Sequence, residues 1–174
     1  DYKTSISDVV TEADRAAERF VAETLAELRP HDGVLGEEGA SKHGDSSRTW
    51  VIDPVDGTFN FTQGSDYFCS ALALVEGDPS DPARILIGAV HRPAMKTTWL
   101  AHDGVATRNG EPLPDLAPAS LPSQGLVTYL HPTFMRDDAI RNAWLRAVRD
   151  AATIRMWGAG SVDLSNIASG QLGG

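Results

Sequence analysis

The segment 50–61, with the sequence WVIDPVDGTFNF, restricts the fold of this chain more than any other part of it. Its three leading apolar residues predict a buried strand that ends at Asp53. Pro54 fixes its own φ and favours extended geometry at Asp53, so the backbone at this point is stiff. Asp-Pro and Asp-Gly are also common turn dipeptides, and by themselves they fit a plain turn equally well. The strand before them favours a ligand site, because ligands of α/β proteins tend to bind at the carboxyl ends of strands.

Asp53 and Asp56 are two carboxylates three positions apart, with no Lys or Arg in the segment to neutralise them. Such a pair at the edge of a core must either take up a proton or bind a cation. A site made only of oxygen ligands selects a hard cation, of which Mg²⁺ is the abundant one, and the carbonyl of Val55 adds a third oxygen. Gly57 allows a ligand to approach the backbone closely, and a helix beginning at Thr58 would direct free N–H groups at an anion such as phosphate.

Two further acidic features lie upstream of this segment. Glu37 belongs to a Gly-Glu-Glu-Gly sequence after the short apolar pair Val34-Leu35, and Asp14 lies in the first turn of a predicted helix. Each has an ordinary explanation when taken alone, since glutamates on loops are usually solvated and acidic residues favour helix N-termini. Their order along the chain relative to Asp53 is more specific than either feature by itself.

The bulk composition excludes several classes of function. The 174 residues carry a net charge of −9, and a negative field of this size disfavours binding to nucleic acid. No apolar run approaches the roughly 20 residues of a membrane span, so no membrane partner is expected. The single cysteine, Cys69, rules out an internal disulfide, and together with an N-terminus that lacks a signal-peptide pattern it predicts a cytoplasmic protein. The five histidines lack metal-ligand spacing, so carboxylates are the better metal candidates.

Hydrophobic periodicity and turn chemistry predict the order of the elements. An amphipathic helix spans 11–28, with Thr11 and Asp14 as its capping start and Phe20 and Leu28 among its apolar positions. Sheet-type runs and then mixed elements follow: strands at 50–52, 67–76, 85–91 and 97–101, a strand at 126–130, a helix at 137–151, a strand at 154–156 and a helix at 160–170. The Pro-rich link at 112–123 predicts two lobes, with an α+β lobe at 1–120 that carries the metal site and the start of an α/β lobe at 121–174.

Four segments of the chain follow one another in the order DVVTEAD, GEE, WVIDPVDGTFNF and RMWGAGSVDLSNIASG. In their sequence and their order they resemble the inositol monophosphatase family of Mg²⁺-dependent, lithium-sensitive phosphatases. The resemblance implies an α/β layered sandwich, in which layers of helix and sheet alternate. It also implies Mg²⁺-dependent hydrolysis of a small phosphorylated alcohol, such as an inositol phosphate, by a homodimer.

The resemblance assigns a role to each matching position. It implies one Mg²⁺ held by Glu37, Asp53 and the carbonyl of Val55, and a second shared by Asp53 and Asp56. Thr58 with Asp14 would orient and deprotonate the attacking water. The remaining matches are phosphate-binding N–H groups at Gly57 and Thr58, and substrate-binding positions Gly158, Ala159 and Gly160.

Alternatives remain open at this point. Members of the family that act on histidinol phosphate, fructose 1,6-bisphosphate or a 3′-phosphorylated nucleotide share the same metal signature. The family's first helix, before Lys3, and its later Trp-Asp segment, which supplies a ligand to the second metal, have no counterpart in these 174 residues. A second alternative is therefore a truncated, non-catalytic module that binds a metal or a partner.

Overall fold

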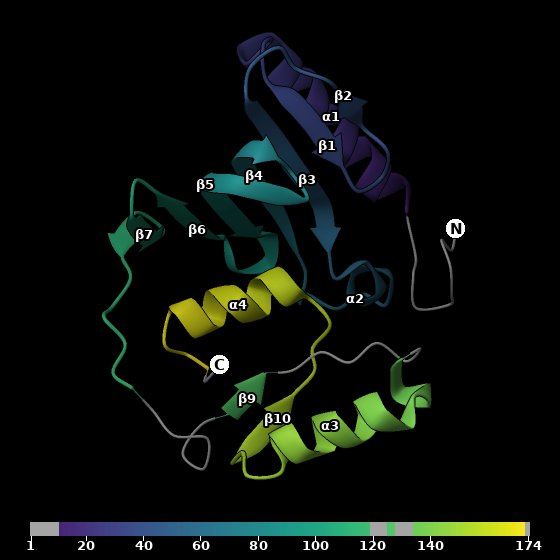
Figure 1. Cartoon of the computed structure of the whole chain (residues 1–174), viewed down its shortest axis with the longest axis vertical. Helices are drawn as coiled ribbons and strands as arrows, with labels where there is room; N and C mark the ends of the chain where they lie inside the picture. Colours follow the sequence, from purple (N-terminus) through teal and green to yellow (C-terminus); the bar gives the residue numbers. More distant parts are fainter. Residues whose placement is uncertain (1–10, 119–124, 128–133, 173–174) are drawn as a thin grey trace.

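The computed structural model describes residues 11–118, 125–127 and 134–172 (Figure 1). Its centre is an eight-stranded sheet in the order β2-β1-β3-β4-β5-β6-β7-β8. The strands are β1 Gly33–Gly36, β2 Ser41–Lys42, β3 Arg48–Asp56, β4 Cys69–Asp78, β5 Asp81–Arg92, β6 Thr97–His102, β7 Val105–Arg108 and β8 Glu111–Pro112. Only the β1–β3 pair is parallel; all other neighbours in this sheet are antiparallel.

A second, two-stranded parallel sheet and the helices complete the fold. The small sheet pairs β9 Gly125–Val127 with β10 Thr153–Arg155. The helices are α1 Glu12–Leu28, α2 Thr58–Thr62, α3 Asp138–Val148 and α4 Gly160–Ala168, with short 3₁₀ turns η1 Pro93–Met95 and η3 Phe134–Arg136. Figure 1 shows α4 between the large sheet and the small one, with α3 at the end of the molecule opposite β1 and β2.

Helix α1 begins with the predicted capping box. The Thr11 side chain accepts from the N–H groups of Ala13 and Asp14, and the Asp14 carboxylate accepts from the Thr11 N–H. The buried stripe of the helix differs from the predicted apolar face. Phe20 and Leu28 are 70% and 72% exposed. The predicted apolar positions Val21 and Leu25 do face the sheet, together with Ala22 and with the acidic residues Asp14 and Glu18, which the apolar pattern did not include.

The large sheet is covered by different helices on its two faces. On one face, Leu25 of α1 packs with Trp50 and Ile52 of β3 and Leu74 of β4. Cys69 and Val90 face the opposite side, where they pack against Ala159 and Val162 at the start of α4. Because side chains alternate across a strand, β4 supplies Leu74 to the first core and Cys69 to the second.

Several turns have the chemistry that the sequence indicates. Asp103-Gly104 and Asn109-Gly110 both take positive φ and join β6 to β7 and β7 to β8. The sequence patterns predicted neither β7 nor β8, because each is too short to show a period. β3 also runs on to Asp56 rather than ending at Asp53.

The division into lobes at residue 120 stays a prediction. Residues 33–112 build the large sheet and residues 125–155 build the small one, but α4 packs on β4 and β5. Part of the predicted strand at 126–130 lies outside the described residues. No helix within the described ranges is long and apolar enough to cross a membrane.

Candidate active site

A bulge in β3 places the two aspartates on one face of the sheet. In a regular strand, residues three positions apart point to opposite faces. Here Asp53 pairs with Ala71 and Asp56 pairs with Cys69, so β3 contains one extra residue between them. Pro54 lies within this irregularity, where a missing N–H costs no ladder bond, and its carbonyl accepts from Ser70 Oγ at 2.7 Å. Asp53 and Asp56 therefore both face the side of the sheet that α4 covers.

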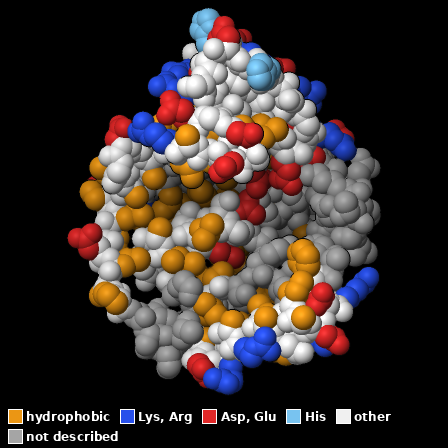
Figure 2. Space-filling model, in the orientation of Figure 1, with side chains coloured by type: hydrophobic (Ala, Val, Ile, Leu, Met, Phe, Trp, Pro, Cys, Tyr) orange, Lys and Arg blue, Asp and Glu red, His pale blue; other side chains and the backbone are white. Residues whose placement is uncertain are grey.

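Asp53 carries a buried oxygen that nothing in the protein satisfies. Among the described residues, its Oδ1 is the one buried side-chain N or O atom with no hydrogen-bond partner. Burial, then the negative charges of Glu37 and Asp56, raise the pKa of Asp53 to about 8. Figure 2 shows acidic side chains gathered beside a hollow, in the region where Figure 1 places the end of β3 and α2.

Glu37 reaches this region from the loop after β1. Its N–H donates to the carbonyl of Ile52 at 3.1 Å, which fixes its backbone beside Asp53. The negative charges of Glu37 and Asp56 thus both act on Asp53. Two half-buried carboxylates, Asp53 and Asp56, with the Glu37 carboxylate beside Asp53, are the kind of oxygen donors that a hard divalent cation prefers. The residues present at Asp53 fit a Mg²⁺ ion.

Asp56 is turned toward α4 rather than toward Glu37. Its Oδ1 accepts the N–H of Gly160 at 3.1 Å, and its Oδ2 accepts the N–H of Ser161. Cys69 Sγ lies 3.8 Å from the same Oδ2. In the part of the chain that the structure describes, no three acidic, histidine or cysteine side chains converge closely enough to hold a metal ion together. The three predicted carboxylate ligands are neighbours, but Asp56 caps the start of α4.

Thr58 and Asp14 meet although 44 positions separate them in the sequence. Thr58 Oγ1 lies 3.0 Å from Asp14 Oδ1 and 2.8 Å from the Val55 carbonyl, and its single proton serves one of these acceptors at a time. Asp14 is 1% exposed, and its other oxygen accepts the N–H of Thr11. One carboxylate therefore both caps α1 and contacts the Thr58 hydroxyl.

Gly57 brings the acidic segment against the start of α4. Its φ is +92°, a conformation that favours glycine, and α2 begins at the next residue. A Cβ at this position would lie 3.0 Å from the Cβ of Ala159 and 3.3 Å from the carbonyl of Gly158. The predicted phosphate-binding and substrate-binding segments are thus in direct contact.

Ala159 is fully buried as the N-cap of α4, and Gly158 before it has a φ of +74°. The Asn60 side chain holds this segment in place, because its Nδ2 donates to the carbonyls of Trp157 at 2.6 Å and Tyr67 at 2.9 Å. The sequence analysis did not identify this role of Asn60. No local signal marks it, since its partners lie up to 97 residues away.

Three hydrogen-bonded polar side chains lie between α4 and the segment before β4. Tyr67 Oη donates to Asp163 Oδ1 at 2.6 Å, and Asn166 Nδ2 donates to Tyr67 Oη at 3.3 Å. Burial raises the pKa of Asp163, whereas the bond from Tyr67 opposes this rise. Burial and then Asp163 raise the pKa of Tyr67 above its usual value. Asp163 and Asn166 therefore anchor α4 to the loop that precedes β4.

Cys69 is a free thiol that is fully buried against Ala159 and Val162. Burial, then the charges of Asp56 and Asp53, raise the pKa of this thiol well above its usual range. A thiolate at this position would be strongly disfavoured.

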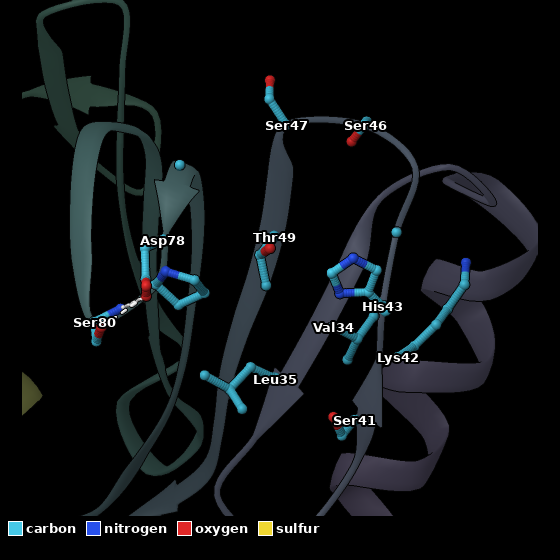
Figure 3. A pocket seen from close by; sticks show the side chains of 13 residues that line it. Val34, Leu35, Ser41, Lys42, His43, Ser46, Ser47, Thr49, Asp78 and Ser80 are labelled. Carbon is cyan, nitrogen blue, oxygen red and sulfur yellow. Dashed lines mark hydrogen bonds between the residues drawn. The ribbon is translucent and has the colours of Figure 1, made fainter.

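A separate cavity of about 570 Å³ lies at the β1–β2 end of the sheet, away from these residues (Figure 3). Val34 and Leu35 contribute apolar surface to it. Its charged groups are engaged within the protein: Asp78 accepts from Ser80 at 2.7 Å, and Lys42 donates to the Pro30 carbonyl and extends away in Figure 3. The residues predicted for metal and substrate binding do not line this cavity.

Comparison with known proteins identifies the family to which this geometry belongs. The family model described as the inositol monophosphatase family matches residues 1–174. The chain belongs to the inositol monophosphatase family. This finding confirms the resemblance that the four sequence segments indicate.

Named relatives in the family include phosphatases for different esters. An inositol-1-monophosphatase of Rhizobium meliloti is 33% identical over 174 residues, which cover 97% of this chain and 62% of the relative. A histidinol-phosphatase of Mycobacterium tuberculosis is 45% identical over 96 residues, covering 55% of this chain and 35% of the relative. A Thermotoga maritima fructose-1,6-bisphosphatase/inositol-1-monophosphatase is 40% identical over 110 residues, covering 63% and 40%. The chain thus spans between about a third and three fifths of these relatives.

Solved structures share the fold. The IMPase of Thermotoga maritima superposes with a TM-score of 0.82 at 30% identity, covering 98% of this chain and 63% of that one. The predicted α/β layered sandwich is therefore confirmed.

Proposed function

We propose that this chain carries the active site of a Mg²⁺-dependent phosphatase that hydrolyses a small phosphate monoester, such as an inositol monophosphate. The observation that carries the proposal is Asp53, whose buried, unpartnered Oδ1 lies within the electrostatic reach of Glu37 and Asp56. Family membership and the names of the relatives support the same chemistry.

Glu37, Asp53, the carbonyl of Val55 and Asp56 are the proposed metal ligands. When bound, Mg²⁺ supplies positive charge that offsets the carboxylates and lowers the pKa of an attacking water. Asp56 has to exchange its contacts with the N–H groups of Gly160 and Ser161 for this role. The start of α4 would then be free to meet the substrate.

Thr58 and Asp14 form the proposed proton-transfer pair. When the Thr58 hydroxyl donates to Asp14 Oδ1, its own lone pairs accept a hydrogen bond from water. The proton of that water passes to Thr58 Oγ1 as the hydroxyl proton moves toward Asp14. The buried position of Asp14 holds the pair in one geometry, so little ordering remains for the reaction.

Substrate binding is proposed at the contact between two backbone segments. The N–H groups of Gly57 and Thr58 are assigned to the phosphate by family resemblance, and Gly158, Ala159 and Gly160 to the alcohol. The close approach of Gly57 to Ala159 supports one continuous pocket for both parts of the ester.

Histidinol phosphate is the second candidate substrate. The 45% identity to a histidinol-phosphatase favours it, although only 35% of that relative is matched. Fructose 1,6-bisphosphate is a further candidate substrate, because the Thermotoga maritima relative is named a fructose-1,6-bisphosphatase/inositol-1-monophosphatase. A 3′-phosphorylated nucleotide shares the same chemistry, and a non-catalytic binding module is the remaining alternative.

The test measures phosphate release from these four esters with and without Mg²⁺. Asp53→Asn serves as the control for contaminating phosphatases. We expect Mg²⁺-dependent release by the unmodified chain at a rate far above that of Asp53→Asn. Equal release by both proteins would overturn the proposal and favour the binding module.

The choice of Mg²⁺, a homodimeric state and a cytoplasmic location are also proposed. The oxygen-only ligand set supports Mg²⁺, and the single, buried cysteine supports a reducing compartment. The homodimer follows from family resemblance. Sedimentation velocity checks it, since a monomer at micromolar concentration would contradict it.

A further inference from the structure

Glu18 is a buried carboxylate on the sheet-facing side of α1. It is only 3% exposed, and among the described residues it forms no ion pair. Burying a charge without a cation is costly unless strong hydrogen bonds compensate. Such a residue therefore has a task that an apolar side chain at the same position would not perform.

The two Glu18 oxygens hold the loop that follows β1. Oε2 accepts the N–H of Glu38 and Oε1 accepts the N–H of Ala40, each at 2.7 Å. These are short, charge-assisted hydrogen bonds. Gly36 leaves the space for the carboxylate, because a Cβ on it would lie 2.3 Å from Glu18 Cδ.

This loop carries Glu37, which is thereby fixed on both sides. The N–H of Glu37 itself donates to the Ile52 carbonyl, directly before Asp53. The next N–H along the chain, that of Glu38, is bound by Glu18. With both peptide groups anchored, the Glu37 side chain starts from a fixed backbone when it approaches Asp53.

Asp14 and Glu18 are one helical turn apart on the same face of α1. The first contacts Thr58, and the second holds the Glu37 loop. We propose that Glu18 is a positioning residue, which sets the Mg²⁺ affinity of the site by fixing the backbone on which Glu37 stands. This inference deepens the proposed function and rests on it.

Glu18→Gln is the main test variant. The amide oxygen still accepts one N–H, but the NH₂ group confronts the other N–H and breaks that bond. Mutating a residue that holds a metal ligand in place typically weakens metal binding by about 10- to 100-fold. We expect the Mg²⁺ dissociation constant, measured by calorimetry, to rise about tenfold, and exchange of the Glu38 and Ala40 amides to become faster. Glu23→Gln, an exposed position on the same helix, should leave both unchanged.

Gly36→Ala tests the same mechanism without changing any charge. The added methyl must displace the Glu18 carboxylate, so it should weaken Mg²⁺ binding as Glu18→Gln does. Gly88→Ala is the matched control, because its new Cβ meets no atom within 4 Å. Both changes disrupt the same contact, that between the Glu18 carboxylate and the loop after β1. The double variant Gly36→Ala/Glu18→Gln should therefore bind Mg²⁺ no more weakly than the weaker-binding single variant.

Activity separates positioning from a general loss of structure. Excess Mg²⁺ should restore the turnover of Glu18→Gln to near that of the unmodified chain, with the KM for the ester unchanged. If Glu18→Gln is folded and binds Mg²⁺ as tightly as Glu23→Gln, the positioning role is wrong while the proposed function survives. If Glu18→Gln does not fold, the Mg²⁺ affinities of Gly36→Ala and Gly88→Ala are compared instead. Equal affinities of these two variants would show that the positioning role is wrong. If the unmodified chain itself neither binds Mg²⁺ nor releases phosphate, the proposed function fails and this inference fails with it.

Discussion

Single side chains in this site serve structure and proposed chemistry at once. Asp14 accepts the Thr11 N–H with one oxygen, as a capping residue does, and contacts the Thr58 hydroxyl with the other. Asp53 has the opposite character, because its buried Oδ1 makes no hydrogen bond in the protein. The first residue is stabilised within the fold, whereas the second is left to be satisfied by a ligand.

Thr58→Ala should separate metal binding from turnover. The hydroxyl is the proposed acceptor of the water's proton, and removing such a group costs at least about 100-fold in rate. The Mg²⁺ dissociation constant should stay unchanged, as measured by calorimetry beside the phosphate-release assay. Thr62→Ala, which removes a hydroxyl bound only to the Phe59 carbonyl in the same helix, is the control. An unchanged rate in Thr58→Ala would disprove the Thr58–Asp14 assignment.

Asp53→Asn should abolish the stabilisation by Mg²⁺. Burial and the neighbouring carboxylates raise the pKa of Asp53 and make its ionised form unfavourable in the metal-free protein. A neutral amide avoids this cost, so the metal-free variant should melt at the same temperature as the unmodified chain or higher. Saturating Mg²⁺ should raise the melting temperature of the unmodified chain only. Thermal melts with Mg²⁺ or a chelator check this. A similar rise for both proteins would place the metal elsewhere.

At the scale of elements, Asp32 fastens the end of α1 to the sheet. Its carboxylate accepts from Arg29 Nε at 2.9 Å, Ser46 Oγ at 2.9 Å and Trp50 Nε1 at 3.1 Å. Burial by itself would raise the pKa of Asp32, but these three donors outweigh it and hold the pKa below its usual value. The junction between α1, the loop before β3 and β3 itself is thus tied by one charged group.

Asp32→Asn should make the protein less stable at neutral pH and less sensitive to acid. Because the folded pKa is below the unfolded value of about 3.9, the stabilisation is complete above that pH and is lost as pH falls through the folded pKa. The loss at pH 7 should be about 1 to 3 kcal/mol. Urea unfolding between pH 7 and pH 2 measures the difference in the free energy of unfolding between the unmodified chain and Asp32→Asn. This difference should become smaller in acid. Asp45→Asn, at an exposed position in the same region, is the control; a difference independent of pH would contradict the assignment.

At the scale of the whole molecule, one sheet separates two apolar cores. Ile52 lies in the core under α1, and Val162 lies in the core under α4. The acidic segment at the end of β3 lies where the second core begins, so that α4 and β3 meet at Asp56. The site therefore lies where the end of β3 meets the start of α4, and neither element provides it alone.

Ile52→Ala and Val162→Ala should destabilise the protein independently. The first should cost about 2 to 5 kcal/mol and the second about 2 kcal/mol, since both side chains are almost fully buried. Because they share no packing partner, the losses should add within about 0.5 kcal/mol in the double variant. Urea unfolding measures all three. Leu164→Ala, at a position 68% exposed, should cost less than about 0.5 kcal/mol. A marked departure from additivity would show that the cores are coupled.

The sequence by itself determined the elements with strong local signals. The capping box at Thr11, the strand around Trp50 and the Asp-Gly and Asn-Gly turns follow from spacing and backbone chemistry. The four motif segments also identified the family and its layered fold, which the comparisons confirm. The roles of the individual site residues stay proposals. Local sequence signals are enough to predict an element when the contacts that stabilise it are between residues close together in the chain.

Only the tertiary structure decided which polar groups are buried and what they contact. The periodicity of α1 placed Phe20 and Leu28 on its apolar face, whereas the sheet buries Asp14 and Glu18 instead. The stripe of positions 14, 18, 21 and 25 could have indicated this, because it puts Glu18 in line with Val21 and Leu25. The bulge in β3 and the capping of α4 by Asp56 depend on partners 13 to 105 residues away, which no local pattern encodes. Burying a carboxylate is favourable only where distant backbone N–H groups or a cation meet it, and folding alone brings those together.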